Sequence, residues 1–192
     1  MTRKYTDELK SELTTTLPDN STGLITPALL RGVIEDVIDS LRPAWAGIRA
    51  DHSAAPVSFA TSATWTKINA AGLWTVGGQS DNSEFSYDLV NGELVTKFAN
   101  YNHLCQAAIN FAGTTNVEYQ FSLAMNGVPL GTLVSVDGDG AGRILQAADM
   151  AIIISTAVND RISLMVRSPG GASSIQISQA DVFGQMQTTR YP

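Results

Sequence analysis

The stretch 117–127, VEYQFSLAMNG, decides how most of the chain folds. Every second residue from Val117 to Met125 is apolar, and this alternation indicates a β-strand with one buried face. Asn126-Gly127 closes the run. Asn-Gly is the strongest two-residue hairpin signal because both residues tolerate the positive φ of a type I′ turn. The stretch therefore predicts an antiparallel strand that ends in a tight hairpin.

Similar short runs continue on both sides, at spacings of roughly ten residues. EFSYDLV and ELVTKFA flank Asn91-Gly92, which predicts a second type I′ hairpin. The other runs are TWTKI, GLWTV, HLCQAAINF, DMAIIIST, RISLMVR and IQISQADVFGQM, with turn signals at DGDGAG, Asn159-Asp160 and SPGGASS. Eight or nine short strands without an internal repeat predict a mainly β fold, an antiparallel jelly-roll sandwich.

Charge divides the chain near residue 50. Thirteen Asp, Glu, Lys and Arg residues lie in the first fifty positions, against seventeen in all of the remainder. We expect an extended, solvated N-terminal arm over residues 1–25, a helix and linker over 26–50, and the jelly-roll domain over 51–192.

A short helix is predicted over about residues 27–41. Thr26 provides an N-cap, Pro27 suits the first helical position, and Pro43 disfavours helical geometry in the residue before it. The apolar stripe of this helix contains a heptad seam formed by Leu30, Ile34, Val37 and Leu41. An isolated helix of about 22 Å is marginal in water. The stripe must therefore pack either on the β domain of its own chain or on copies of the same helix.

Composition excludes several classes of function. The net charge is −6 and no basic cluster is larger than Arg3-Lys4, which argues against nucleic-acid binding. The longest apolar run, MAIII, is too short to span a membrane. The first residues have no apolar run behind them, so we expect no secretion signal and synthesis in a reducing cytoplasm. The single cysteine, Cys105, has no partner for an internal disulfide and too few companions for a zinc site.

Catalytic and metal signatures are weak. His103 and Cys105 would share one face of a strand, but no third, orienting group is identifiable, so a buried structural cysteine is the preferred interpretation. DGDGAG begins like a calcium loop, but Ala148 stands where the bidentate Glu is needed. Trp65 and Trp74 are expected in the core, with a sugar-stacking platform as the alternative. We expect no enzyme, cofactor or metal site.

Two resemblances add to this interpretation. EYQFSLAMNGVPLG, VNDRISLMVRS and IQISQADVFGQM resemble the second half of tumour-necrosis-factor-like jelly rolls. Asn126-Gly127, Asn159-Asp160-Arg161-Ile162 and Phe183-Gly184 match that family's turn and strand motifs. Asn159 replaces the family's Gly, and Asn also adopts left-handed geometry. The resemblance implies a compact trimer whose protomers meet along one face of the sandwich.

LPDNSTGLITPALLRGVIEDVIDSL is similar to a segment of tailed-bacteriophage virion proteins, in which such a phrase leads into a short helix ahead of a fibre or jelly-roll domain. The match is carried by Leu17, Pro18, Asp19, Asn20, Gly23, Ile25, Thr26 and Pro27. It implies a structural protein of a phage and not an enzyme.

Together the resemblances imply a homotrimeric capsid decoration or head-fibre protein on the outer surface of the virion. We expect the arm to bind the major capsid protein through Arg3, Lys4, Tyr5, Leu9, Leu17, Pro18, Asp19 and Asn20. The helices would form a three-helix bundle in which Leu30, Ile34, Val37 and Leu41 face a common axis. The alternative is a receptor-binding tail fibre or tail-tip protein that recognises a host surface glycan or protein.

Overall fold

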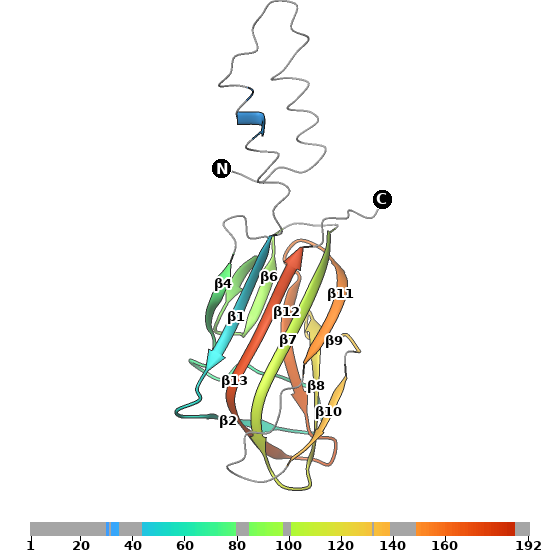
Figure 1. Ribbon diagram of the computed structural model, residues 1–192. Helices are drawn as coiled ribbons and strands as arrows, with labels where there is room; N and C mark the ends of the chain where they lie inside the picture. Colours follow the sequence, from blue (N-terminus) through green and yellow to red (C-terminus); the bar gives the residue numbers. More distant parts are fainter. Residues whose placement is uncertain are drawn as a thin grey trace, which may run out of the picture. The chain divides into compact units, whose positions relative to one another are not determined.

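The computed structural model describes residues 30, 32–34, 44–79, 85–97, 101–131, 133–138 and 149–186 (Figure 1). Two compact units make up the chain, Met1–Ala44 and Trp45–Pro192. In the first unit, residues 30 and 32–34 are helical, within the predicted helix. The rest of that helix and the whole arm over residues 1–25 lie outside the described residues. No helix in the described part of the chain is long and apolar enough to cross a membrane.

Two antiparallel sheets form the second unit. We name sheet A the one with strand order β11-β7-β13-β1-β4, with β2 paired to β13; sheet B has the order β10-β8-β12-β6-β5, with β3 on β12 and β9 on β8. The strands of sheet A are β1 (Trp45–Asp51), β2 (Val57–Thr61), β4 (Thr75–Gln79), β7 (Tyr101–Gly113), β11 (Met150–Thr156) and β13 (Ser173–Met186). Those of sheet B are β3 (Thr66–Lys67), β5 (Phe85–Asp88), β6 (Glu93–Thr96), β8 (Glu118–Met125), β9 (Val128–Pro129), β10 (Val134–Asp137) and β12 (Arg161–Arg167).

The pairing of these strands is that of a jelly roll. In chain order the principal strands are β1, β6, β7, β8, β10, β11, β12 and β13, and the first pairs with the last, the second with the seventh, and so on inward. The pairs are β1–β13, β6–β12, β7–β11 and β8–β10, all antiparallel. Such nested pairing is a long hairpin rolled into two sheets. The predicted fold class is confirmed.

Side chains that alternate along the long strands form the core. On β7 every second residue from His103 to Phe111 is buried, and Tyr119, Phe121 and Leu123 do the same on β8. The ring of Phe111 packs against Phe121 at 4.8 Å and against Tyr119 at 5.6 Å between centroids. On β7 the alternation therefore reports which face is buried. On β8, Ser122 and Ala124 on the other face are buried as well.

The Asn126-Gly127 hairpin prediction is confirmed. The two residues are the whole connection between β8 and β9, with φ of +53° and +77°, as a type I′ turn requires. The side chain of Asn126 also joins this turn to the next one in space. Its Nδ2 donates to Asp160 Oδ1 at 2.8 Å, and its Oδ1 accepts from the Arg161 amide at 3.0 Å.

The Asn91-Gly92 prediction is wrong in turn type, although a hairpin is present. Asp88 pairs with Glu93, so the loop has four residues and not two. Gly92 has φ of +65°, whereas Asn91 does not adopt a positive φ. The carboxylate of Asp88 accepts from the Asn91 amide and from Asn91 Nδ2, at 3.2 and 2.9 Å. This side-chain closure competes with the tight turn.

The sandwich also begins earlier than expected. Residues 45–50 were assigned to the linker, but Trp45–Asp51 is β1, which pairs with β13 over its full length. Its inward residues Ala46, Ile48 and Ala50 are buried. The strand is difficult to recognise in the sequence because two of its three core side chains are small and apolar and therefore contrast weakly with their neighbours.

Candidate self-association surface

The outer face of sheet A is built from rows of side chains that run across the strands. Because alternate residues point outward, each row takes one residue from each strand in register. In order from β1 through β13 and β7 to β11, the rows are Trp45, Gln185, Leu104, Ile153; then Gly47, Phe183, Gln106, Ala151; then Arg49, Asp181, Ala108, Asp149. Asp149 precedes Met150, the first residue of β11, and extends its register by one position.

The first two rows are largely apolar. The rings of Trp45 and Phe183 stack at 5.7 Å between centroids with 26° between their planes. Gly78 on β4 leaves room for the indole, since a Cβ there would lie 3.2 Å from the ring. Ile153 on β11 is 60% exposed. Large apolar groups thus gather at the end of sheet A where β1 begins and β13 ends (Figure 1).

The opposite end of the same face is polar. Arg49 Nε lies 3.8 Å from Asp181 Oδ1, and Asn110 Nδ2 donates to Gln179 Oε1 at 3.0 Å. Burial raises the pKa of Asp181, and the nearby Arg49 offsets this only in part. The Asp181 side chain is about half exposed in the single chain, so a counter-charge becomes important when another surface covers it.

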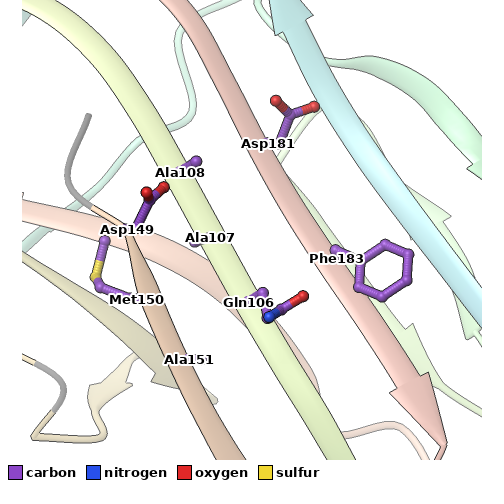
Figure 2. Close-up of a pocket in the computed structure, with 8 residues that line it drawn as sticks. All are labelled: Gln106, Ala107, Ala108, Asp149, Met150, Ala151, Asp181 and Phe183. Carbon is purple, nitrogen blue, oxygen red and sulfur yellow. The ribbon is translucent and has the colours of Figure 1, made fainter. Parts of the chain in front are cut away.

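A groove of about 440 Å³ crosses this face over β7. Its lining residues are Gln106, Ala107, Ala108, Asp149, Met150, Ala151, Asp181 and Phe183. Figure 2 shows the Asp149 and Asp181 carboxylates on opposite sides of β7, with Ala108 between them. The small alanine side chains form the floor of the groove, and the larger side chains of Asp149, Asp181 and Phe183 form its walls.

The structure places the sequence-predicted contact residues as follows. In the first unit Leu30 is 46% and Ile34 48% exposed, while Val37 and Leu41 lie outside the described residues. The expected capsid-binding positions Arg3, Lys4, Tyr5, Leu9, Leu17, Pro18, Asp19 and Asn20 also lie outside them. The seam and the arm contacts therefore stay predictions.

His103 and Cys105 face the core, as neighbours on the inner side of β7. Cys105 is fully buried, and burial raises the pKa of its thiol to about 12, so the thiol stays protonated at neutral pH. His103 Nδ1 and Thr156 Oγ1 form a hydrogen bond of 3.0 Å, and Phe85 packs edge-on against the imidazole. The arrangement suits packing and not nucleophilic chemistry. In the described residues no group of three His, Cys, Asp or Glu side chains could hold a metal ion.

The two tryptophans singled out in the sequence have different surroundings. Trp74 is buried, and its Nε1 donates to the Ile68 carbonyl at 2.7 Å, so it is a core residue as expected. Trp65 is half-buried and immediately precedes β3, and the Arg167 guanidinium lies over its ring at 4.7 Å from the centroid. Because Arg167 covers one face of this ring, Trp65 does not offer an open platform on that side.

Comparisons with known proteins give likenesses of fold alone. No protein-family model matches the chain, and no curated protein does. Among solved structures, the chain is similar to Eiger TNF from S. frugiperda (TM-score 0.49, 11% identity, 79% of this chain and 98% of the other). It is also similar to the PRD1 vertex protein P5 (TM-score 0.48, 11% identity, 74% of this chain and 96% of the other). A third likeness is to the globular domain of zebrafish complement 1qA protein (TM-score 0.44, 7% identity, 77% of this chain and 99% of the other). The jelly-roll assignment itself rests on the strand pairing described above.

Proposed function

We propose that the protein is a homotrimeric structural protein of a tailed-phage virion that binds and stabilises the exterior of the capsid, as a decoration or head-fibre protein. The observation that carries the trimer is the apolar end of sheet A. A sandwich with a solvated outer face presents polar side chains there. Here Trp45, Phe183, Leu104 and Ile153 form a contiguous group, which is the chemistry of a surface covered by another protein surface.

The two ends of the sandwich suit different tasks. β1 begins at the apolar end, so the arm and helix of residues 1–44 join the domain there. The connections β1–β2, β7–β8 and β12–β13 lie at the opposite end (Figure 1). An arm anchored on a shell would therefore leave these three loops directed outward. Three arms of one trimer bind together, and avidity makes the attachment strong even when each arm binds weakly.

The proposed mechanism of stabilisation is mass action. A trimer whose arms bind neighbouring capsid subunits binds only the assembled shell, so it shifts the equilibrium toward that shell. The arm residues expected to make these contacts are Arg3, Lys4, Tyr5, Leu9, Leu17, Pro18, Asp19 and Asn20. The helical seam Leu30, Ile34, Val37 and Leu41 would hold the three arms together.

One observation favours the second candidate, a receptor-binding fibre or tail-tip protein. The hydroxyl of Tyr119 accepts from the Thr114 amide at 2.9 Å, donates to the Ser174 carbonyl at 2.9 Å, and lies 2.8 Å from Ser173 Oγ. These bonds fix the β7–β8 loop against the first two residues of β13, where the β12–β13 loop ends. A rigid, polar loop pair at the outward end is suited to recognition of a glycan or protein.

A pair of matched substitutions tests the trimer. Ile153→Asp places a charge in the apolar row and should convert trimers to monomers in light scattering. Val90→Asp introduces the same charge at a residue 80% exposed in the β5–β6 loop and should leave the mass unchanged. Wild-type protein that is monomeric at micromolar concentration would refute the trimer.

Addition of the protein to capsids stripped of it, and separately to host cells, distinguishes the two functions. Shell binding that raises the heat resistance of the capsids supports decoration. Cell binding that blocks phage adsorption supports the receptor function instead. Deletion of residues 1–25 should abolish shell binding while the trimer persists.

A further inference from the structure

The groove on sheet A has the chemistry of a receptor for one cationic side chain. Asp149 and Asp181 stand on opposite sides of it, and Ala108 between them leaves space above the floor. When another protein surface covers these carboxylates they lose water, and an unpaired carboxylate under a covering surface is strongly unfavourable. A cation that enters with the covering surface removes that cost.

One cation lies at the same level of the sheet. Arg49 belongs to the row that contains both carboxylates. Among the described residues, Arg49 is the only lysine or arginine whose side chain projects from the outer face of sheet A. In its own chain Arg49 lies 3.8 Å from Asp181, and both side chains are about half exposed. Such a surface pair contributes little, so the guanidinium is free to take a better partner.

Asp149 is out of reach of Arg49 within one chain. Two strands, β13 and β7, separate them, which makes three strand spacings or about 14 Å between the backbones. Contact between Arg49 and Asp149 therefore has to come from two different copies of the chain. This separation makes the pair diagnostic of assembly.

Symmetry selects Arg49 as the residue that fills the groove. In the proposed trimer we place the rotation axis along the strands of the sandwich, so that the outer face of sheet A in each copy meets the next copy. Rotation about such an axis leaves every residue at its own height. The residues that meet at the height of Asp149 and Asp181 then come from their own row, and Arg49 is the cation of that row.

We propose that Arg49 of each copy enters the groove of the next copy and pairs there with Asp149 and Asp181. This inference rests on the proposed trimer and adds the residue that completes its polar contact. The planar guanidinium presents several N–H donors in a fixed fork, which suits two facing carboxylates better than an ammonium group does. The apolar rows would supply the contact area, and this ion pair would fix the register between copies.

A short thiol cross-linker tests the contact in the full-length chain. The double variant Arg49→Cys with Asp149→Cys, treated with a short bifunctional methanethiosulfonate reagent, should become linked chain to chain and give covalent trimers on a non-reducing gel. The linker replaces the length of the arginine side chain, because an Arg–Asp ion pair leaves the two backbones too far apart for a direct disulfide. Within one chain, about 14 Å between the backbones is too far for so short a linker. Cys105 is buried and stays out of the reaction. The control pair, Arg167→Cys with Asp149→Cys, should remain uncross-linked because Arg167 lies on sheet B.

Charge reversal gives a second measurement, which holds even if the cysteine variant dissociates. Arg49→Glu and Asp149→Arg should each raise the concentration at which trimers dissociate by roughly tenfold or more, and the double variant should restore it. A wild-type trimer with neither cross-linking nor charge-swap rescue overturns this inference and leaves the proposed function standing. A monomeric wild-type protein overturns both.

Discussion

Replacement of Gly184 by alanine should destabilise the sandwich strongly. Gly184 lies on β13 at a position where a side chain would point into the core. A Cβ at this position would lie 2.5 Å from Cζ of Phe85 and 2.9 and 3.0 Å from the adjacent ring atoms. The glycine of the Phe183-Gly184 motif is therefore explained by the ring that fills its place.

The magnitude follows from how little Phe85 can move. A normal carbon–carbon contact is near 3.5 Å or more, so the ring would have to retreat by about 1 Å. Phe85 is completely buried, and its ring is held against His103 at 4.9 Å between centroids. Overpacking of this kind costs about 1–3 kcal/mol, and the tight surroundings place Gly184→Ala near the upper value. In a unit of this size, 3 kcal/mol lowers Tm by roughly 6–12 °C.

Thermal and urea unfolding followed by circular dichroism measure the effect, at one fixed protomer concentration because self-association shifts apparent stability. Gly170→Ala in the β12–β13 loop is the control. Nothing would lie within 4 Å of its Cβ, and its φ is not positive. We expect it to change the free energy of unfolding by less than about 1 kcal/mol.

A size-compensating substitution tests the cause. Phe85→Leu shortens the group that opposes the new methyl, so in the Gly184→Ala background it should cost at least about 1 kcal/mol less than it does alone. Gly184→Ala with wild-type Tm, or strict additivity of the two substitutions, would refute the steric explanation.

Three further predictions concern polar groups. Glu93 is buried and accepts hydrogen bonds from Lys67 Nζ at 2.6 Å and from Arg161 Nη1 at 2.5 Å. Glu93→Gln should therefore lower the free energy of unfolding in urea by about 2 kcal/mol, less than for a fully buried ion pair because both cations are partly exposed. An unchanged urea midpoint would contradict this. Hydrogen bonds from Asn91, and then from Arg161, lower the pKa of Asp88 below its ordinary 3.8. The stability it contributes is present above pH 3.8 and disappears as the pH falls toward the folded pKa. Asp88→Asn should therefore flatten the acid limb of a stability–pH curve, and an identical limb would argue against it. Cys105 should resist a thiol reagent in the native protein at pH 8 and react after denaturation, and rapid native labelling would contradict its burial.

Strand existence and type could be predicted wherever the alternation was strong. The runs over β7, β8, β11, β12 and β13 were recognised because large apolar side chains alternate with polar ones, and the turn at Asn126-Gly127 because only certain residues adopt its geometry. Where side chains are small, as at Ala46 and Ala50 on β1, the contrast is weak and the strand was missed. The four-residue β5–β6 loop was also missed, because the Asp88 side chain and not local preference closes it.

The proposed self-association surface could not be predicted from the sequence, for a different reason. A period of two shows which residues share a face of one strand, but not which strand lies beside it. Trp45, Phe183 and Leu104 come together only because β13 is inserted between β1 and β7. The signal available in advance was an aromatic residue at an outward position on each of two strands, and it becomes informative only once the pairing is known.

The β12–β13 loop gives the domain a use as a display scaffold. Ser168 anchors it at the base, through its amide to the Ser62 carbonyl at 2.8 Å and through its hydroxyl to Thr61 at 3.0 Å. At its tip, a side chain added at Gly170 or Gly171 would meet open space. A peptide inserted between these glycines would leave the anchored base unchanged. It would project from the end of the sandwich opposite the start of β1 (Figure 1). The end of β13 instead lies beside the start of β1. Foreign epitopes that must stand clear of the end of the sandwich where β1 begins therefore belong in this loop.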